Sequence, residues 1–338
     1  MKAKIKPRID LENRTKLETV IPLKTPFIIN VDPADVCNFQ CKFCPTADRE
    51  LMKATPGRFF GLMDFNLYKK VVDDIGQFEQ PIKVLRLYKE GEPLLHPKFP
   101  EMVKYARQSG CCERIDTTTN ASRLSPELNV RLTEAGLDRL NVSIYGMNPK
   151  QYQSFSGATV DFDRLVANIR HFYERRGKCE MIIKINGDII SEEDKQRFYD
   201  VFGDIADGVY IEHIMSCWPE FDLVEHGVTV NPELGIYGQP IKEVQVCPYI
   251  FYSFSINSNG SASACFLDWE RKLVIGDTRT QSVKEIWEGA QLLAHQKMML
   301  RGERKGHLVC GNCDQLRRGH PDDIDVYAEA LLSRMRAG

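Results

Sequence analysis

The most reactive residues of this sequence are its 11 cysteines, most of which fall into two groups. The first group, Cys37, Cys41 and Cys44, has the spacing Cys-x3-Cys-x2-Cys. Three thiolates on so short a loop can hold three irons of a [4Fe–4S] cube and leave the fourth iron without a protein ligand. An iron with a free position can bind a substrate or cofactor, as catalytic metals do. A zinc knuckle is the alternative, but it needs a fourth ligand that the neighbouring residues do not provide.

The second group lies in the last third of the chain and comprises Cys247, Cys265, Cys310 and Cys313. Four thiolates are a complete ligand set for a second cube or for one zinc ion. A fully ligated cube has no open iron for a substrate, so its expected role is electron transfer. A zinc ribbon is the alternative, because two separated cysteine pairs also build that site.

Alternating strand-like and helix-like segments surround the cysteines and must position them. We predict strands from the short β-rich runs at residues 27–32, 83–88, 114–118, 139–143, 181–186 and 209–213. We predict helices between them, from capping residues and apolar periodicity, at residues 64–78, 100–109, 125–135, 161–176 and 191–202. Strands joined by such crossovers pair in parallel. Six of these units predict an incomplete barrel, with its ligand site at the carboxyl ends of the strands.

The rest of the chain divides by pattern into further segments. Residues 1–26 are polar with little periodicity, and residues 216–246 are rich in Pro and Gly, which predicts a linker or lid. An Asn259-Gly260 turn predicts a hairpin in the small segment that follows. The predicted units are an N-terminal extension at 1–26, the barrel at 27–215, a linker or lid at 216–246, a small α+β domain at 247–316 with a helix at 283–300, and a tail at 317–338 with a helix at 322–335.

The first cysteine group, with Phe43 just before its last cysteine and at the end of the first strand, resembles the radical S-adenosylmethionine (SAM) superfamily. The resemblance implies that the open iron binds the amino and carboxylate groups of SAM. Reductive cleavage of SAM then gives a 5′-deoxyadenosyl radical, which abstracts a hydrogen atom from the substrate. The protein contributes binding, orientation and exclusion of water.

Further positions match the same family in order along the chain. Glu90-Gly91-Glu92-Pro93 resembles the Gly-Gly-Glu-Pro segment that meets the SAM amino group, although Glu90 replaces the first glycine. Glycine allows backbone conformations that glutamate does not, so this replacement bears on the local geometry. The SAM contacts implied by the resemblance are Phe43, Gly91, Glu92, Asn120, Ser143 and Lys184.

The second cysteine group resembles the SPASM/twitch extension of radical SAM enzymes. Its Cys–Gly–Cys hairpin precedes Ile275-Gly276-Asp277 and a final Cys-x2-Cys, and no cysteine follows Cys313. The resemblance implies one auxiliary [4Fe–4S] cluster held by Cys247, Cys265, Cys310 and Cys313. The fold class expected is therefore α/β, a partial (β/α)6 TIM-like barrel followed by a small α+β twitch/SPASM-like domain.

These features predict an enzyme with two [4Fe–4S] clusters and SAM, served by an electron donor such as flavodoxin or ferredoxin. We expect it to oxidise an alcohol carbon of a small polar substrate, such as a sugar, aminocyclitol or nucleotide sugar, with the auxiliary cluster accepting an electron. One alternative is an epimerase in which Cys217 donates a hydrogen atom. Others are a peptide or protein maturase and, outside enzymes, a zinc-stabilised scaffold. Glu90, Glu212, His213 and Glu220 are all candidates for the base.

Composition narrows the choice of partners and location. Lys and Arg number 45 and Asp and Glu 47, so no excess of positive charge indicates a nucleic acid or an anionic membrane. Neither a secretory signal nor a transmembrane apolar run is recognisable. We therefore expect a cytoplasmic protein without a membrane or nucleic-acid partner.

Overall fold

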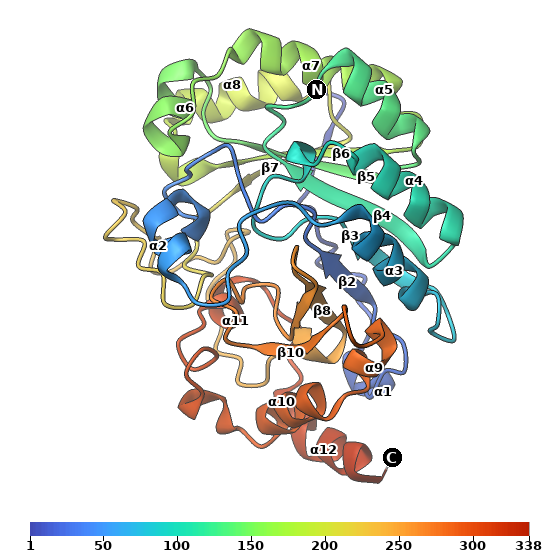
Figure 1. Ribbon diagram of the computed structural model, residues 1–338. Helices are drawn as coiled ribbons and strands as arrows, with labels where there is room; N and C mark the ends of the chain where they lie inside the picture. The colour runs from blue at the N-terminus through green and yellow to red at the C-terminus, as the bar shows by residue number, and fades with distance from the viewer. Residues whose placement is uncertain (338) are drawn as a thin grey trace.

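The computed structural model describes residues 1–337. Its strands form one continuous sheet (Figure 1). The strands are β1 (Lys4–Ile5), β2 (Ile28–Val31), β3 (Ile82–Arg86), β4 (Cys112–Thr119), β5 (Arg139–Ile144), β6 (Glu180–Asn186), β7 (Gly208–Glu212), β8 (Ser253–Ile256), β9 (Ser261–Ser263) and β10 (Val274–Asp277). Their order across the sheet is β1-β7-β6-β5-β4-β3-β2-β8-β9-β10. The six predicted strands are thus confirmed as β2 to β7, and their neighbours pair in parallel.

The helices start where the sequence provides caps. Asp64, Ser125, Asp161 and Ser191 each accept a hydrogen bond from a backbone N–H of the first turn, which satisfies donors that the helix itself leaves unpaired. The α-helices are α1 (Leu17–Val20), α2 (Arg49–Ala54), α3 (Phe65–Ile75), α4 (Phe99–Ser109), α5 (Pro126–Glu134), α6 (Pro149–Ser156), α7 (Phe162–Arg175), α8 (Glu192–Phe202), α9 (Val283–Trp287), α10 (Ala290–Leu300), α11 (Gln315–Arg318) and α12 (Ala328–Ala337).

Two sheet pairings at the edges of the barrel go beyond the sequence prediction. Strand β8 pairs in parallel with β2, so the predicted hairpin extends the barrel sheet instead of forming a separate layer. Strand β1 pairs in parallel with β7, so the first residues of the predicted N-terminal extension join the sheet. Both edges of the predicted six-stranded barrel sheet therefore pair with a further strand, which leaves less strand edge exposed.

Two helix predictions needed correction, and two short helices were missed. The helix predicted over 283–300 is two helices, because Gly289 adopts an extended backbone that caps α10 and ends the preceding turn. The tail helix begins at Ala328, after a 3-10 turn at Asp325–Tyr327, instead of at residue 322. Helices α2 and α6 were not predicted, since both are short and α6 carries only a weak apolar pattern, QYQSFS, after its Pro149.

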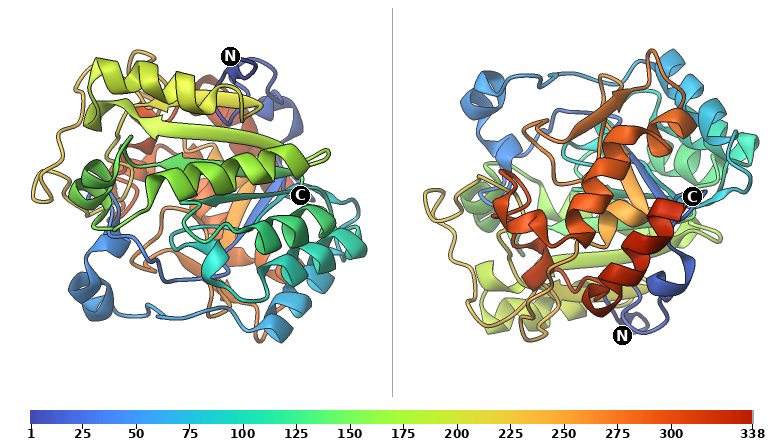
Figure 2. Two further views of the ribbon diagram at one scale, coloured as in Figure 1. Left: turned by 90° about the horizontal axis from the view of Figure 1, so that it is seen from above. Right: turned by 90° about the horizontal axis from the view of Figure 1, so that it is seen from below.

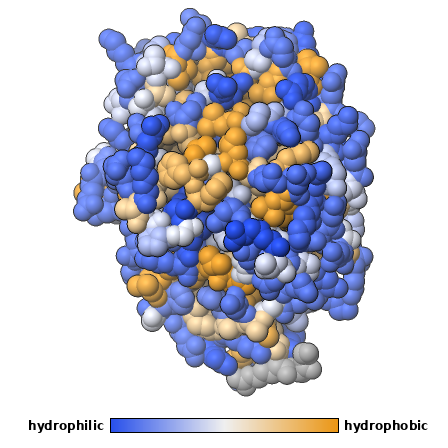
Figure 3. All heavy atoms as spheres, viewed as in Figure 1, coloured by the Kyte–Doolittle hydropathy of each residue, from blue (hydrophilic) through white to orange (hydrophobic). Residues whose placement is uncertain are grey.

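The helices cover the sheet in two groups. Helices α3 to α8 lie on the outside of the barrel strands, and α9 to α12 cover the opposite end around β8 to β10 (Figures 1 and 2). One apolar cluster runs from the barrel into the C-terminal segment and includes Phe254 and Trp287, whose rings stack. The face in Figure 3 is mostly hydrophilic, with apolar patches across its middle. Among the described helices, none is long and apolar enough to cross a membrane.

Candidate active site

The first cysteine group lies on the loop between β2 and α2. Cys37, Cys41 and Cys44 are free thiols that line one cavity. Burial raises the pKa of Cys37 to about 12, with a smaller contribution from the nearby Glu92 carboxylate. Burial also raises the pKa of Cys41, and the neighbouring Cys44 and Cys37 thiolates raise it further. Three thiols that raise one another's pKa in a buried site would be stabilised as thiolates by a bound cation.

The loop after β3 packs directly on this cysteine loop. The Glu92 backbone N–H donates to the Val36 carbonyl at 2.9 Å. A Cβ on Gly91 would lie 1.9 Å from the Ala34 carbonyl oxygen and 2.5 Å from that of Val36. Only glycine allows so close an approach, which explains this residue type. Glu90 does not have a positive φ, so its replacement of glycine needs no left-handed backbone.

Glu92 and Asn120 connect the ends of β3 and β4 to the cysteine loop. The buried Glu92 carboxylate accepts from the Thr119 hydroxyl at 2.6 Å, the Asn120 N–H at 2.7 Å and the Leu94 N–H at 3.0 Å. The Asn120 amide donates to Asn38 Oδ1 at 3.1 Å and approaches Cys37 Sγ at 3.9 Å. Both residues line the cavity, where they hold the loop geometry around Cys37.

The other three predicted SAM contacts are placed differently from one another. Phe43 lines the cavity and stacks on Tyr145, with ring centroids 6.2 Å apart. Lys184 also lines it and forms an ion pair with Glu212. Ser143 is buried next to Lys184 in the sheet, but the described residues that line the cavity do not include it.

The second cysteine group is gathered from three distant segments. Burial is the main cause that raises the pKa of Cys247 to about 12, and the charges of Cys313 and Cys310 raise it further. Burial raises the pKa of Cys265 as well, and the charges of Cys313 and Cys247 raise it further. The four thiols are therefore close enough to act on one another electrostatically. Arg304 is buried and donates to the Cys310 carbonyl at 2.8 Å, which fixes the Cys310–Cys313 turn.

Four cysteines are a ligand set that suits either a zinc ion or a [4Fe–4S] cube. Among residues 1–337, no three His, Cys, Asp or Glu side chains lie close enough together to hold one metal ion. Zinc would need thiolates about 4 Å apart, because Zn–S bonds are about 2.3 Å long. A [4Fe–4S] cube binds each cysteine through a different iron and so spaces the ligands more widely.

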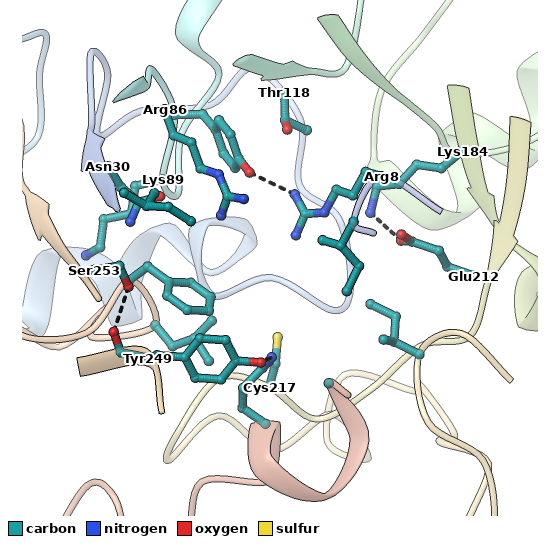
Figure 4. Close-up of a pocket in the computed structure, with 18 of the residues that line it drawn as sticks. Arg8, Asn30, Arg86, Lys89, Thr118, Lys184, Glu212, Cys217, Tyr249 and Ser253 are labelled. Carbon is teal, nitrogen blue, oxygen red and sulfur yellow. Dashed lines mark hydrogen bonds and ion pairs between the residues drawn. The ribbon is translucent and has the colours of Figure 1, made fainter. Parts of the chain in front are cut away.

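One cavity of about 690 Å³ extends from the first cysteine group to residues beside the second, whose own four cysteines are not part of its described lining. This volume lies within the range of about 300–1,000 Å³ that is typical of small-molecule sites. Its wall includes Phe266, Leu267 and Gln315, which flank cysteines of the second group. Cys217 also lines the cavity. Burial is the main cause that raises the pKa of Cys217 to about 12, and the charges of Cys44 and Cys313 also raise it. Cys217 thus lies near both groups, and Figure 4 shows its sulfur directed into the cavity.

The four candidate bases occupy different environments. Glu212 lines the cavity, and its Oε1 is buried without a hydrogen-bond partner in the described residues. His213 also lines it, with Nδ1 2.8 Å from Asp188 Oδ1. Glu220 accepts from Asn312 at 3.0 Å and does not belong to the described lining. Glu90 reaches the cavity wall, but its carboxylate is committed to ion pairs with other residues.

Those ion pairs form a buried network between the barrel and the C-terminal segment. Asp35 and Glu90 both pair with Arg58 and Arg271, and Glu90 also pairs with Lys89. The side chains involved are at most 3% exposed. Burial alone would raise the pKa of Glu90, but the charges of Lys89, Arg271 and Arg58 lower it. Glu90 is therefore a structural anion in this fold.

Sequence reasoning missed the arginines that enter the cavity. Arg86, Arg114 and Arg139 belong to parallel strands and line its wall, and Arg8 reaches it from the N-terminal segment. Charged residues inside strands of a parallel sheet were a usable signal, since such strands are normally apolar on both faces. Nothing in the local sequence indicated Arg8.

Comparison with known proteins assigns this fold and site to a family. Residues 31–204 match the Radical SAM superfamily, and residues 247–314 match the SPASM iron–sulfur cluster-binding domain. The chain therefore belongs to the radical SAM superfamily and carries a SPASM-type domain. Its cofactors are accordingly SAM and more than one [4Fe–4S] cluster.

Similar proteins share the architecture at low identity. AdoMet-dependent heme synthase of Methanosarcina barkeri is 27% identical over 317 residues, which cover 82% of this chain and 85% of that protein. The structure of BtrN in complex with AdoMet and 2-DOIA aligns with a TM-score of 0.54 at 19% identity, over 85% of this chain and 92% of that one. The structure of Streptococcus suis SuiB bound to precursor peptide SuiA aligns with a TM-score of 0.58 at 12% identity, over 89% of this chain and 72% of that one. The two structures show the fold alone.

Proposed function

We propose that this radical SAM enzyme oxidises a C–H group that bears a hydroxyl in a small polar substrate. The observation that carries the proposal is one cavity that the first cysteine group lines and that extends to Phe266, Leu267 and Gln315, which flank cysteines of the second group. When bound, SAM and its cluster supply a 5′-deoxyadenosyl radical, and the auxiliary cluster supplies an acceptor for one electron. A substrate in this cavity would therefore be near both. The complex of BtrN with AdoMet and 2-DOIA, a similar fold with a small ligand, supports this substrate class.

The cofactor ligands follow from the two cysteine groups. We assign Cys37, Cys41 and Cys44 to the cluster that binds SAM, because they share the cavity with Gly91, Asn120 and Lys184. The auxiliary cluster is assigned to Cys247, Cys265, Cys310 and Cys313, which supply a full set of four ligands. Gly91 and the Asn120 loop shape the SAM side of the cavity, and flavodoxin or ferredoxin is the proposed electron donor.

Oxidation of the alcohol carbon needs a proton acceptor as well as an electron acceptor. The substrate loses one hydrogen atom to the 5′-deoxyadenosyl radical, one proton from its hydroxyl group and one electron. We assign the proton to Glu212, whose unpartnered Oε1 lies in the cavity wall. Lys184 pairs with the other carboxylate oxygen and orients Glu212.

Epimerisation is the second candidate, and one observation favours it. The Cys217 thiol points into the cavity and its raised pKa keeps it protonated, as a hydrogen-atom donor must be. In that case Cys217 would return a hydrogen atom to the substrate carbon, and the substrate mass would not change.

The deciding experiment offers substrates to the anaerobic, reconstituted enzyme with SAM and a strong reductant in D2O. One pool contains sugars, aminocyclitols and nucleotide sugars, and the other contains peptides. We expect the small-molecule pool to stimulate 5′-deoxyadenosine release and to yield a product two hydrogens lighter. One incorporated deuterium without oxidation would establish epimerisation instead. Stimulation by peptides alone would overturn the substrate class.

A further inference from the structure

The deep part of the cavity contains a layer of charged side chains inside the barrel. The strand register places Arg86, Asp116, Arg139 and Glu180 side by side on β3, β4, β5 and β6. Barrel interiors are usually filled by branched apolar side chains. Arg86 and Arg139 line the open cavity instead. Charges in such a position require partners of opposite sign.

The guanidinium groups of this layer outnumber the carboxylates that reach them. Arg86 and Arg114 share Asp116, at 3.7 and 3.9 Å, distances too long for hydrogen bonds. Arg139 shares Glu180 with Lys6. Within residues 1–337, the buried Nε atoms of Arg86 and Arg114 have no hydrogen-bond partner. The layer therefore carries positive charge that the protein does not neutralise.

Arg8 adds a further guanidinium group from the N-terminal segment. Pairing of β1 with β7 leads the following residues across the cavity, where Arg8 Nη1 donates to the Tyr88 hydroxyl at 2.9 Å. Among the described residues Arg8 forms no ion pair within 4.0 Å, and the Glu212 carboxylate, which pairs with Lys184, acts on it only from a greater distance. The guanidinium groups of Arg8 and Arg86 both point into the middle of the cavity in Figure 4. Two like charges in this position repel each other, and an anion between them would offset that repulsion.

We propose that Arg8 and Arg86 bind an anionic oxygen group of the substrate, a carboxylate or a phosphate. Guanidinium groups present paired donors that match the oxygens of both groups, and such charge-assisted hydrogen bonds are strong. The Tyr88 hydroxyl lies beside Arg8 and adds a further polar contact. Arg86 belongs to β3, whereas Gly91 lies in the loop that follows this strand. The anion site is therefore set apart from the SAM side of the cavity. The inference rests on the proposed function in taking this cavity as the substrate site.

The test compares anionic and neutral ligands of one scaffold by calorimetry on the anaerobic holoenzyme saturated with SAM. The probes are glucuronate for the carboxylate, glucose 6-phosphate for the phosphate, and glucose as the neutral control. We expect at least one anionic probe to bind about tenfold or more tightly than glucose. Arg8→Gln and Arg86→Gln should each remove about tenfold of that affinity. Arg131→Gln, which removes an exposed charge on α5, should leave it unchanged.

Two further readouts separate the possible failures. Uncoupled release of 5′-deoxyadenosine reports the proposed radical chemistry, so its absence from the native enzyme would overturn the proposed function without affecting the binding result. Equal affinity for all three probes, or full anion affinity in both arginine variants, would overturn the anion site. An equal loss of SAM affinity in both variants would also overturn it, because the arginines would then hold the SAM carboxylate. Arg8→Gln removes only one hydrogen bond to Tyr88 and keeps the test valid should Arg86→Gln misfold.

Discussion

At the scale of single residues, the site depends on a few buried charges whose surroundings differ sharply. Glu90 and Glu212 are both buried carboxylates near the cavity. Glu90 is surrounded by three cations, whereas Glu212 has one, Lys184, and keeps an oxygen without a partner. A proton acceptor needs a lone pair that no other group occupies, so the proposed base is Glu212, whereas Glu90 has a structural role.

Substitution of Glu212 tests this distinction. We expect Glu212→Gln to keep releasing 5′-deoxyadenosine while oxidised product falls by about 10² or more, the usual contribution of a general base. Glu220→Gln, a substitution outside the described cavity lining, serves as the matched control and should behave like the native enzyme. Both products are quantified by mass spectrometry. Native rates of oxidation in Glu212→Gln would refute the assignment.

Asp32 provides a prediction about pH. Burial, followed by the charges of Asp35 and Glu90, raises its pKa to about 8, and its Oδ2 has no partner among the described residues. The unfolded pKa is about 3.9. The folded state therefore binds more protons between these values, and the free energy of unfolding falls as pH rises, by up to about 1.4 kcal/mol per unit.

The variant Asp32→Asn removes this titration. Thermal unfolding of both anaerobic holoenzymes is followed at pH 6, 7 and 8. We expect the Tm of the native enzyme to fall relative to that of the variant as pH rises. Parallel pH profiles would show that Asp32 is already ionised in the folded protein.

At the scale of elements, the site is built where loops from neighbouring strands contact each other. The loops after β2 and β3 approach so closely that Gly91 has no room for a side chain. The loop after β4 joins them through the hydrogen bonds of Glu92 and Asn120. These contacts keep the cysteine loop in one conformation, which is the preorganisation that a cluster site needs.

We expect Gly91→Ala to disturb the contact between these loops, because its Cβ would lie 1.9 Å from the Ala34 carbonyl oxygen. Overpacking of this kind costs about 1–3 kcal/mol. SAM affinity should fall about tenfold, measured by calorimetry, and Tm should fall as well. Gly306→Ala is the control, since its Cβ would meet no atom within 4 Å. An unchanged SAM affinity in Gly91→Ala would contradict the proposed role of this loop.

How much the sequence could predict depended on the range of the interactions. The strands from β2 to β7 and their capped helices follow from local periodicity and capping residues, and the cysteine spacing indicated both groups. The pairing of β8 with β2 and of β1 with β7 joins segments far apart in the chain, and no local pattern carries that information. The contacts of Arg8 depend on the second pairing, which explains why this residue was missed.

At the scale of the whole molecule, the barrel and the SPASM segment are joined by a shared sheet and by the buried ion network. Arg271 contributes to both the network and the segment after Cys265, because its Nη1 donates to the Glu90 carboxylate and to the Asp268 carbonyl. The network thus fixes the second cysteine group relative to the first. The proposed electron transfer from the substrate to the auxiliary cluster would require such a fixed arrangement.

Removal of Arg271 should therefore weaken the whole molecule. We expect Arg271→Met to lower the free energy of unfolding by about 3–5 kcal/mol, since part of the charge of Asp35 and Glu90 is left uncompensated. Both residue types carry a Cβ, so the positive φ of 60° at this position is not a cause. Arg131→Met removes an exposed ion pair and should cost about 1 kcal/mol or less. Equal effects in thermal or denaturant unfolding would contradict the structural role of the network.

The central claim is that the two cysteine groups hold clusters with different tasks at one cavity. The most direct test compares Cys37→Ala/Cys41→Ala/Cys44→Ala with Cys265→Ala/Cys313→Ala, each reconstituted anaerobically and measured for iron and for 5′-deoxyadenosine. The first variant should keep the auxiliary iron and release no 5′-deoxyadenosine. The second should still release it but form no oxidised product. Release of 5′-deoxyadenosine by the first variant would contradict the account.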